Sequence, residues 1–305
     1  AYTGGDLIAI CKEHPFYSFY DWFIGTTECN SGVPDQVSRL TLTFHYNDIN
    51  SLEALYRQYP GRIAAVLLEP ATHVLPAPGF LEAVREITRR EGSVLVFDEM
   101  ITGFRWHARG AQTYYGVTPD MATFGKAIGN GFSVAVLVGK REIMELGGIR
   151  HNRPRVFLLS ATHGAETHAL AAALATVREV VNRSVVEHVW QVGKQLIDGI
   201  NGLAAAHGLK GIVETIGLPC SPVIVCRDKS GAVSLPLRTL FLQETIAHGV
   251  LIPYVAPSFA HGDNELDQTL SAVDGALSVY ADALEDGVDR YLVGPSVKPV
   301  FRKYN

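Results

Sequence analysis

The sequence predicts an α/β fold built around a mostly parallel sheet. Between residues 47 and 105, helix signals alternate with short apolar runs, in the order that crossover connections between parallel strands require. The runs are continuously apolar, as in strands buried on both faces, and each is too short for a typical helix. Polar residues follow directly after them, at the edge where open α/β sheets bind ligands.

The first helix of this block is predicted to begin at Asp48 or Asn50, because either side chain can cap a helix. Pro60 and Gly61 end it, since proline and glycine are poor residues for continuing a helix. Its apolar positions are Leu52, Leu55 and Tyr56.

Buried strands are predicted on either side of a second helix, and a polar residue follows each strand. Glu69 follows the strand at 63–68, Asp98 follows the strand at 93–97, and a third strand ends before Lys126. The helix between the first two strands has its apolar residues at helical spacing. They are Phe80, Leu81, Val84 and Ile87. Because parallel strands end at one edge, we expect the three polar side chains to lie near one another.

The second half of the chain predicts a different grouping of elements. Residues 163–207 are rich in Ala, Val and Leu, with charges at helical spacing, which indicates two helices. Beyond Gly211, a strand at 223–226 and helices at 237–247 and 265–284 indicate a small α+β domain. The resulting division is a large α/β domain at 1–165, linking helices at 166–208 and a small C-terminal domain at 209–305.

The composition argues against several classes of partner. The chain has 305 residues and a formal net charge of -5, with no basic stripe suited to nucleic acid and no apolar run approaching the ~18 residues of a membrane span. We therefore expect a small-molecule substrate and neither nucleic acid nor membrane as a partner. The four cysteines lack CxxC spacing, which argues against a metal site and a disulfide framework and favours reduced thiols in a cytoplasmic protein.

Asp98 and Lys126 together suit one cofactor, pyridoxal 5'-phosphate (PLP). A lysine in a partly dry pocket loses proton affinity, and its neutral amine can then attack an aldehyde. An aspartate that faces a pyridine nitrogen keeps the ring protonated, and the protonated ring stabilises a carbanion next to the imine. The alternative is that Asp98 merely ends a strand and that Lys126 is a surface lysine beside a loop containing glycine.

Three segments carry a resemblance to class III PLP-dependent aminotransferases, most closely to the branch that contains glutamate-1-semialdehyde 2,1-aminomutase. They are FDEMITGFR at 97–105, FGKAIGNG at 124–131 and THGAE at 162–166. The resemblance covers nearly the whole chain. It implies the PLP-dependent transferase fold of the aspartate aminotransferase type, with a seven-stranded sheet flanked by helices and a small C-terminal α+β domain. It also implies that an N-terminal portion of the large domain lies upstream of Ala1.

The resemblance implies roles for the residues at the three strand ends. Lys126 forms a Schiff base with PLP, and Asp98 bonds the pyridine nitrogen. Met100 lies against one face of the ring. Glu69 helps to order the pocket beside the cofactor, a binding role rather than that of a catalytic acid.

Phe16 and Thr162 receive roles from the resemblance too, each with an alternative. Phe16 stacks on the other face of the ring, or else belongs to an aromatic patch in the core. Thr162 reaches the cofactor phosphate of another subunit, which implies a homodimer with the active site at its interface. A hydroxyl and a backbone amide at a helix start suit a phosphate. Thr162 could instead, or in addition, cap the Ala-rich helix, with Glu166 in its first turn.

The resulting expectation is a PLP-dependent enzyme that transfers amino groups. It would be an aminotransferase or an intramolecular aminomutase, which is an isomerase, and its substrate would be a small amino, keto or aldehyde compound. The alternative is a truncated or non-catalytic homologue that acts as a partner subunit.

Overall fold

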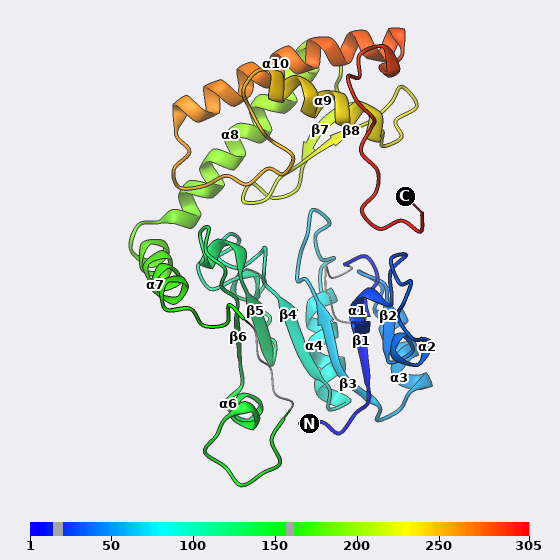
Figure 1. Ribbon diagram of the computed structural model, residues 1–305, viewed down its shortest axis with the longest axis vertical. Helices are drawn as coiled ribbons and strands as arrows, with labels where there is room; N and C mark the ends of the chain where they lie inside the picture. The colour runs from blue at the N-terminus through cyan, green and yellow to red at the C-terminus, as the bar shows by residue number, and fades with distance from the viewer. Residues whose placement is uncertain (15–20, 157–161, 305) are drawn as a thin grey trace. The chain divides into compact units, whose positions relative to one another are not determined.

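The computed structural model describes residues 1–14, 21–156 and 162–304. Its internal contacts divide the chain into two compact units, Ala1–Asn182 with Phe301–Asn305, and Arg183–Val300 (Figure 1). Each unit has its own hydrophobic core. The division expected from the sequence, with separate linking helices at 166–208, places its boundaries elsewhere and stays a prediction.

Unit 1 contains a six-stranded sheet within the described residues. Its strands lie in the order β2-β1-β3-β4-β5-β6, and neighbours are parallel except for β6, which is antiparallel to β5. The mostly parallel sheet is confirmed, with six strands described where the resemblance implied seven. The strands are β1 (Leu7–Cys11), β2 (Thr41–Phe44), β3 (Ile63–Leu68), β4 (Val94–Asp98), β5 (Met121–Phe124) and β6 (Val136–Gly139).

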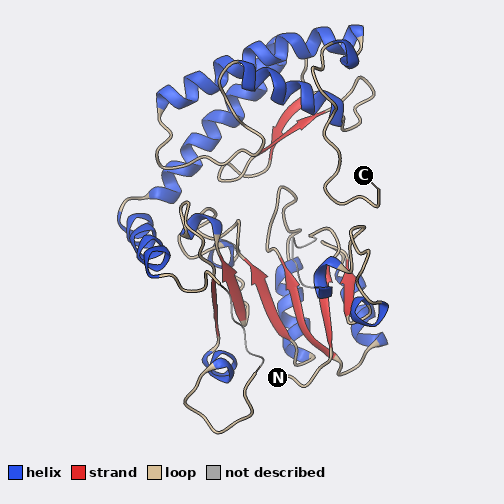
Figure 2. Cartoon of the chain, viewed as in Figure 1, coloured by secondary structure: helices blue, strands red, loops and turns tan. Residues whose placement is uncertain are grey.

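Two helices of unit 1, α3 (Ile49–Gln58) and α4 (Phe80–Arg90), share one core with the strands (Figure 2). The carboxylate of Asp48 accepts the backbone N–H groups of Asn50 and Ser51, so Asp48 is the cap of α3. The other elements of this unit are α1 (Asp21–Ile24), α2 (Asp35–Ser38), α5 (Ala111–Tyr114), α6 (Arg141–Met144), α7 (Thr167–Asn182) and the 3₁₀ turns η1 (Lys126–Ile128) and η2 (Glu145–Gly147).

The register of the sheet brings three strand ends to one edge. Leu68, the last residue of β3, pairs with Phe97 of β4. Asp98, the last residue of β4, pairs with Thr123 of β5. Because these strands are parallel, the residues that follow them gather at their common carboxyl edge.

Unit 2 combines helices with a two-stranded antiparallel sheet, the α+β arrangement expected for the C-terminal part. Its core is formed by residues of its three long helices and both strands, and the fully buried Tyr280 lies within it. The Tyr280 hydroxyl donates to the carbonyl of Arg227 at 2.7 Å, so its polar end is satisfied. The elements are α8 (Val185–Ala206), β7 (Val213–Ile216), β8 (Val223–Cys226), α9 (Leu235–Ala247), α10 (Asp263–Asp286) and the 3₁₀ turn η3 (Val288–Arg290).

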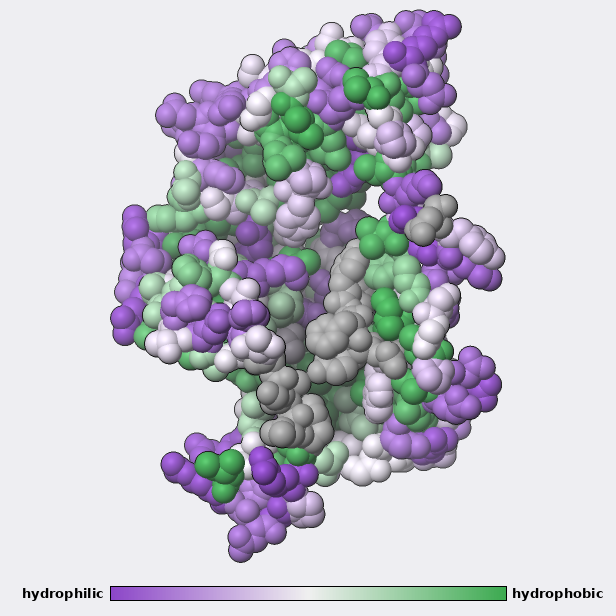
Figure 3. All heavy atoms as spheres, viewed as in Figure 1, coloured by the Kyte–Doolittle hydropathy of each residue, from purple (hydrophilic) through white to green (hydrophobic). Residues whose placement is uncertain are grey.

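Hydrophilic and apolar residues are interspersed on the face of the molecule drawn in Figure 3. No helix among the described residues is both long and apolar enough to cross a membrane.

Candidate active site

Glu69, Asp98 and Lys126 lie at the carboxyl edge of three adjacent strands. Their charges act on one another across this edge. The pKa of Glu69 is raised to about 7: burial is the largest cause, the charge of Asp98 adds to it, and the charge of Lys126 opposes both. Burial also raises the pKa of Asp98, against the bond from the Met100 N–H and the charge of Lys126. Two carboxyl groups and one amine therefore share a single electrostatic environment.

Asp98 uses its two carboxylate oxygens differently. Oδ1 accepts the backbone N–H of Met100 at 2.9 Å and the hydroxyl of Thr123 at 3.3 Å. No donor in the described part of the chain bonds Oδ2. The side chain is thus held in place through one oxygen, and the other remains available to a donor from a ligand.

Lys126 combines an exposed side chain with an unusual backbone. Its φ is +46°, in the left-handed region, a conformation that costs about 1–3 kcal/mol for a residue with a side chain. Asn130, four residues on, also has a positive φ, of +44°. Within the described residues, Lys126 forms no ion pair with Asp98 or Glu69, although its charge acts on both. A gap therefore separates the amine from the two carboxylates.

The exposure of Lys126 corrects one expectation from the sequence. A partly dry pocket was expected around the amine, yet the side chain is exposed and so are the following residues 130–132. The described residues of a single chain do not exclude water from this amine.

Met100 packs closely against Gly125, the residue before Lys126. A β-carbon placed on Gly125 would overlap the Met100 side chain, with its Sδ only 2.6 Å away. The φ of Gly125 is not in the left-handed region, so a β-carbon there would have to displace only the flexible end of Met100. The apolar end of Met100 thus lies against the backbone that leads into Lys126.

The cofactor contacts expected of Phe16 and Thr162 stay predictions. Phe16 lies outside the described residues. Thr162 is exposed and lies in a turn, whereas α7 begins at Thr167. The alternative in which Thr162 caps this helix is wrong, because the Glu166 carbonyl already accepts the Leu170 N–H at 3.0 Å and so marks the helix start. Glu166 accordingly precedes α7 and does not belong to its first turn.

Sequence reasoning assigned no role to Glu99 and Thr123, both of which support the site. Thr123 donates to Asp98, and its signal in the sequence is a hydroxyl residue near the end of the neighbouring strand. Glu99 is 0% exposed, and its carboxylate oxygens accept the N–H groups of Ala111 and Gln112. In the sequence, Glu99 is simply a second acidic residue after Asp98. The sequence does not reveal that the Glu99 carboxylate is buried and that of Asp98 half-buried.

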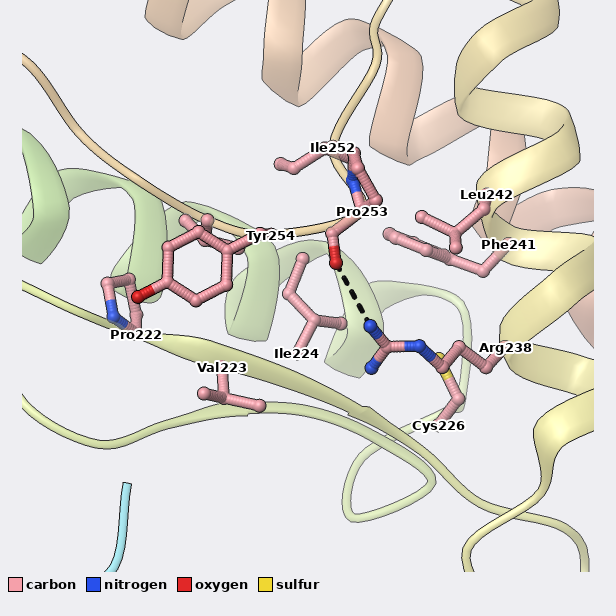
Figure 4. Close-up of a pocket in the computed structure, with 11 residues that line it drawn as sticks. Pro222, Val223, Ile224, Cys226, Arg238, Phe241, Leu242, Ile252, Pro253 and Tyr254 are labelled. Carbon is pink, nitrogen blue, oxygen red and sulfur yellow. Dashed lines mark hydrogen bonds between the residues drawn. The ribbon is translucent and has the colours of Figure 1, made fainter. Parts of the chain in front are cut away.

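Two cavities lined by described residues have none of Glu69, Asp98 and Lys126 in their linings. One of about 590 Å³ lies over the strands of unit 1, and Val94, Val96 and Met121 are among its lining residues. Another, of about 50 Å³, lies in unit 2 (Figure 4). There the Arg238 guanidinium donates to the Pro253 carbonyl at 3.0 Å among mostly apolar side chains. Neither cavity has a carboxylate in its lining, so the candidate site rests on the chemistry of the strand ends.

Comparison with known proteins gives a consistent family. The family model described as aminotransferase class-III matches residues 32–277. The 3-aminobutyryl-CoA aminotransferase of Cloacimonas acidaminovorans is 31% identical over 286 residues, covering 91% of this chain and 66% of that protein. A glutamate-1-semialdehyde 2,1-aminomutase of Syntrophobacter fumaroxidans is 34% identical over 266 residues, covering 80% of this chain and 59% of that protein.

A solved structure agrees with these sequence relatives. The omega-transaminase from Sphaerobacter thermophilus superposes with a TM-score of 0.80 at 25% identity, covering 93% of this chain and 69% of that one. The chain spans only 66% and 59% of the lengths of the two curated relatives named above.

Proposed function

We propose, because the chain belongs to the class III aminotransferase family, that it transfers amino groups between small molecules with the help of PLP. The proposal rests on one observation: Asp98 and Lys126 lie at the ends of neighbouring strands. The carboxylate keeps one oxygen open, and the amine forms no ion pair with it within the described residues. An acid and an amine so arranged can hold two ends of one flat heterocycle.

The residues present fit this cofactor. The open Oδ2 of Asp98 is a suitable acceptor for a protonated pyridine nitrogen. The Lys126 amine is accessible to an aldehyde, and the side chain of Met100 beside Gly125 offers an apolar surface for a ring. We retain Phe16 as the residue proposed for the opposite ring face, on the resemblance alone.

When bound, PLP supplies an electrophilic carbon for amino groups and a ring that withdraws electrons. Oδ2 of Asp98 would accept a hydrogen bond from the protonated ring nitrogen and so keep that nitrogen protonated. Lys126 would bind the cofactor through Nζ and, when released by an incoming amine, would take up and return the proton that moves during transfer. Glu69, with a pKa of about 7, would order the neighbouring side of the pocket and limit the negative charge there.

We further propose that the active unit is a homodimer, with Thr162 of each subunit near the cofactor phosphate of the other. α7 presents apolar side chains to solvent, with Leu170 47%, Leu174 52% and Val181 67% exposed. Phe132 is 50% exposed, and its ring lies 5.7 Å from that of His168 on the same helix. This apolar surface adjoins the Thr162 turn, and a second copy of the chain is the proposed cover. Such a cover would also shield Lys126 from water.

We place the enzyme in the cytoplasm, because Cys11 and Cys226 are buried thiols in no disulfide. Its substrate class is a small amino, keto or aldehyde compound. The relatives include both an aminotransferase and an aminomutase, and the two reactions differ in whether a second substrate is needed. An amino-exchange assay with and without an external keto acid separates them, since a mutase needs none.

The proposal is tested by the visible absorbance of the purified protein after addition of PLP and removal of excess cofactor. We expect the wild type to retain an absorbance band, and Lys126→Ala to lose both the band and amino transfer. Lys140→Ala is a matched control, because Lys140 is an exposed lysine that pairs with Asp120 at the other end of the sheet. A wild-type protein without the band would refute the proposal, as would a Lys126→Ala variant that keeps it.

A further inference from the structure

Glu99 is a fully buried carboxyl group next to Asp98, and the proposed reaction does not use it directly. Its Oε2 accepts the Ala111 N–H at 2.7 Å and the Thr102 hydroxyl, and its Oε1 accepts the Gln112 N–H at 2.9 Å. All three partners are neutral donors. Burial is the main cause of its raised pKa, and these hydrogen bonds oppose that effect. The carboxylate is therefore retained by directed bonds and not by a countercharge.

The segment 99–112 folds around this carboxylate with little freedom. The Glu99 carbonyl accepts the Gly103 N–H at 2.9 Å. A β-carbon on Gly110 would lie 2.5 Å from Glu99 Oε1, and one on Gly103 would lie 2.5 Å from the ring of Phe124. Neither position has room for a side chain, because neighbouring atoms approach the glycine backbone closely. The segment is fixed to the carboxylate on one side and to the end of β5 on the other.

Glu99 also links this segment to Asp98. Its backbone N–H donates to the Thr123 carbonyl at 2.9 Å, and the next N–H, that of Met100, donates to Asp98 Oδ1 at 2.9 Å. The direction of the Met100 N–H depends on the residue before it. If Glu99 lost its anchor, Asp98 would lose its backbone donor, and the Met100 side chain would leave its place against Gly125.

We propose that Glu99 is a positioning residue for the cofactor site. Its buried carboxylate holds segment 99–112 so that Asp98 keeps one oxygen bonded to the protein and the other open, with Met100 against Gly125. This inference rests on the proposed function, because the open oxygen has a role only if a ligand donor meets it.

The informative variant is Glu99→Gln. An amide has one acceptor oxygen, so its NH₂ group must face the N–H of either Ala111 or Gln112, and two donors then oppose each other. We expect the dissociation constant for PLP to rise about tenfold, the effect of losing one hydrogen bond to a charged group. We also expect the pH titration of the bound cofactor's visible absorbance to shift in the direction that Asp98→Asn shifts it.

Asp120→Asn is the matched control for these measurements. It makes the same acid-to-amide change at another buried carboxyl group, one that bonds Arg85 and Lys140 just before β5, three positions before Thr123, the residue paired with Asp98. We expect it to lower thermal stability while leaving the absorbance titration at its wild-type position. Hydrogen exchange of the cofactor-free protein provides a second readout. Amides of residues 99–112 should exchange faster in Glu99→Gln and at the wild-type rate in Asp120→Asn.

Two milder variants keep the test decisive if Glu99→Gln does not fold. Glu99→Asp retains the charge but shortens the reach, and Thr102→Val removes a single donor to the carboxylate. Both should shift the absorbance titration in the same direction by less.

The outcomes distinguish a failure of the proposed function from a failure of the positioning role of Glu99. A wild-type protein that takes up no PLP refutes the proposed function, whatever the variants do. If Asp98→Asn shifts the titration while the folded Glu99 variants titrate as wild type, the positioning role is refuted and the proposed function stands. A joint shift of the Asp98 and Glu99 variants, absent from Asp120→Asn, supports the inference.

Discussion

Asp98 and Asp120 lie at opposite edges of the same sheet and have opposite environments. At the carboxyl edge, Asp98 has one oxygen that no described donor bonds, and burial raises its pKa. At the amino edge, Asp120 is 5% exposed and pairs with Lys140 at 2.7 Å and Arg85 at 2.9 Å. It also accepts the Leu95 N–H at 2.8 Å. Burial raises the pKa of Asp120, but these partners together outweigh it and hold the pKa below its ordinary value.

This contrast separates a group that stabilises the fold from one that is available for chemistry. A carboxylate whose bonds are all made within the protein lowers the free energy of the folded state and has nothing left for a ligand. A half-buried carboxylate with an open oxygen costs stability and is ready to accept a donor. The two edges therefore predict opposite consequences for the same mutation.

Asp98→Asn should give the largest functional effect. The amide oxygen can keep the bonds from Met100 and Thr123, and its NH₂ group takes the place of the open Oδ2, so the fold should be retained. The variant lacks the charge that would hold a proton on the pyridine nitrogen. We expect kcat/KM for amino transfer to fall about a hundredfold to a thousandfold, with thermal stability unchanged or raised. A variant that transfers amino groups at the wild-type rate would contradict this role.

Asp120→Asn should give the reverse result. Its NH₂ group must face either Lys140 or the donors of Leu95 and Arg85, so the exposed Lys140 amine, or the Leu95 N–H together with the partly buried Arg85 guanidinium, loses its acceptor. We expect the free energy of unfolding to fall by about 1–3 kcal/mol, measured by denaturant titration, with PLP affinity of the folded protein unchanged. If stability stayed within about 0.5 kcal/mol, the difference between the two edges would not hold.

Glu69→Gln sharpens the comparison through pH. The folded-state pKa of Glu69, about 7, lies above its ordinary value, so its contribution to stability is fully present below pH 4.5 and is lost as the pH rises through 7. The variant lacks this dependence. Relative to wild type, we expect it to gain up to about 3 kcal/mol of stability between pH 4 and pH 8. If the difference in stability between the two proteins did not change over this pH range, Glu69 would not lie in an environment that disfavours its charged form.

Gly125→Ala should have the smallest effect of the four. The added methyl group displaces the side chain of Met100, an overpacking that costs about 1–3 kcal/mol. We expect a lower melting temperature and weaker PLP binding, and partial recovery of both in the double variant Gly125→Ala with Met100→Ala. Without that recovery, the contact between the two residues would not be the cause.

The strands and their polar ends could be predicted because they depend on local signals. Apolar runs of strand length and the helical spacing of α4 determine where the chain enters and leaves the sheet, and parallel strands must end together. The ion pairs at the amino edge could not be predicted, because they depend on long-range contacts. Nothing near Asp120 in the sequence reveals its pairing with Arg85, which lies on α4 and meets it only after folding.

The candidate site divides in the same manner. Asp98 and Lys126 follow from strand ends and from resemblance, and the structure brings them to one edge. The burial of Glu99 could not be predicted, because its donors at Ala111 and Gln112 reach it only when segment 99–112 closes. The exposure of Lys126 agrees with the alternative that made it a surface lysine: a dry pocket needs walls, and the described residues of one chain leave the amine open to solvent.

Reduction of the PLP-treated protein with borohydride, followed by peptide mass spectrometry, identifies the lysine that binds the cofactor, because it fixes the cofactor to that amine. We expect one phosphopyridoxyl group on the peptide that contains Lys126, and a strong loss of this label in Asp98→Asn. Label on a different lysine, or label at Lys126 that is indifferent to Asp98, would contradict the pairing of these two residues around one ring.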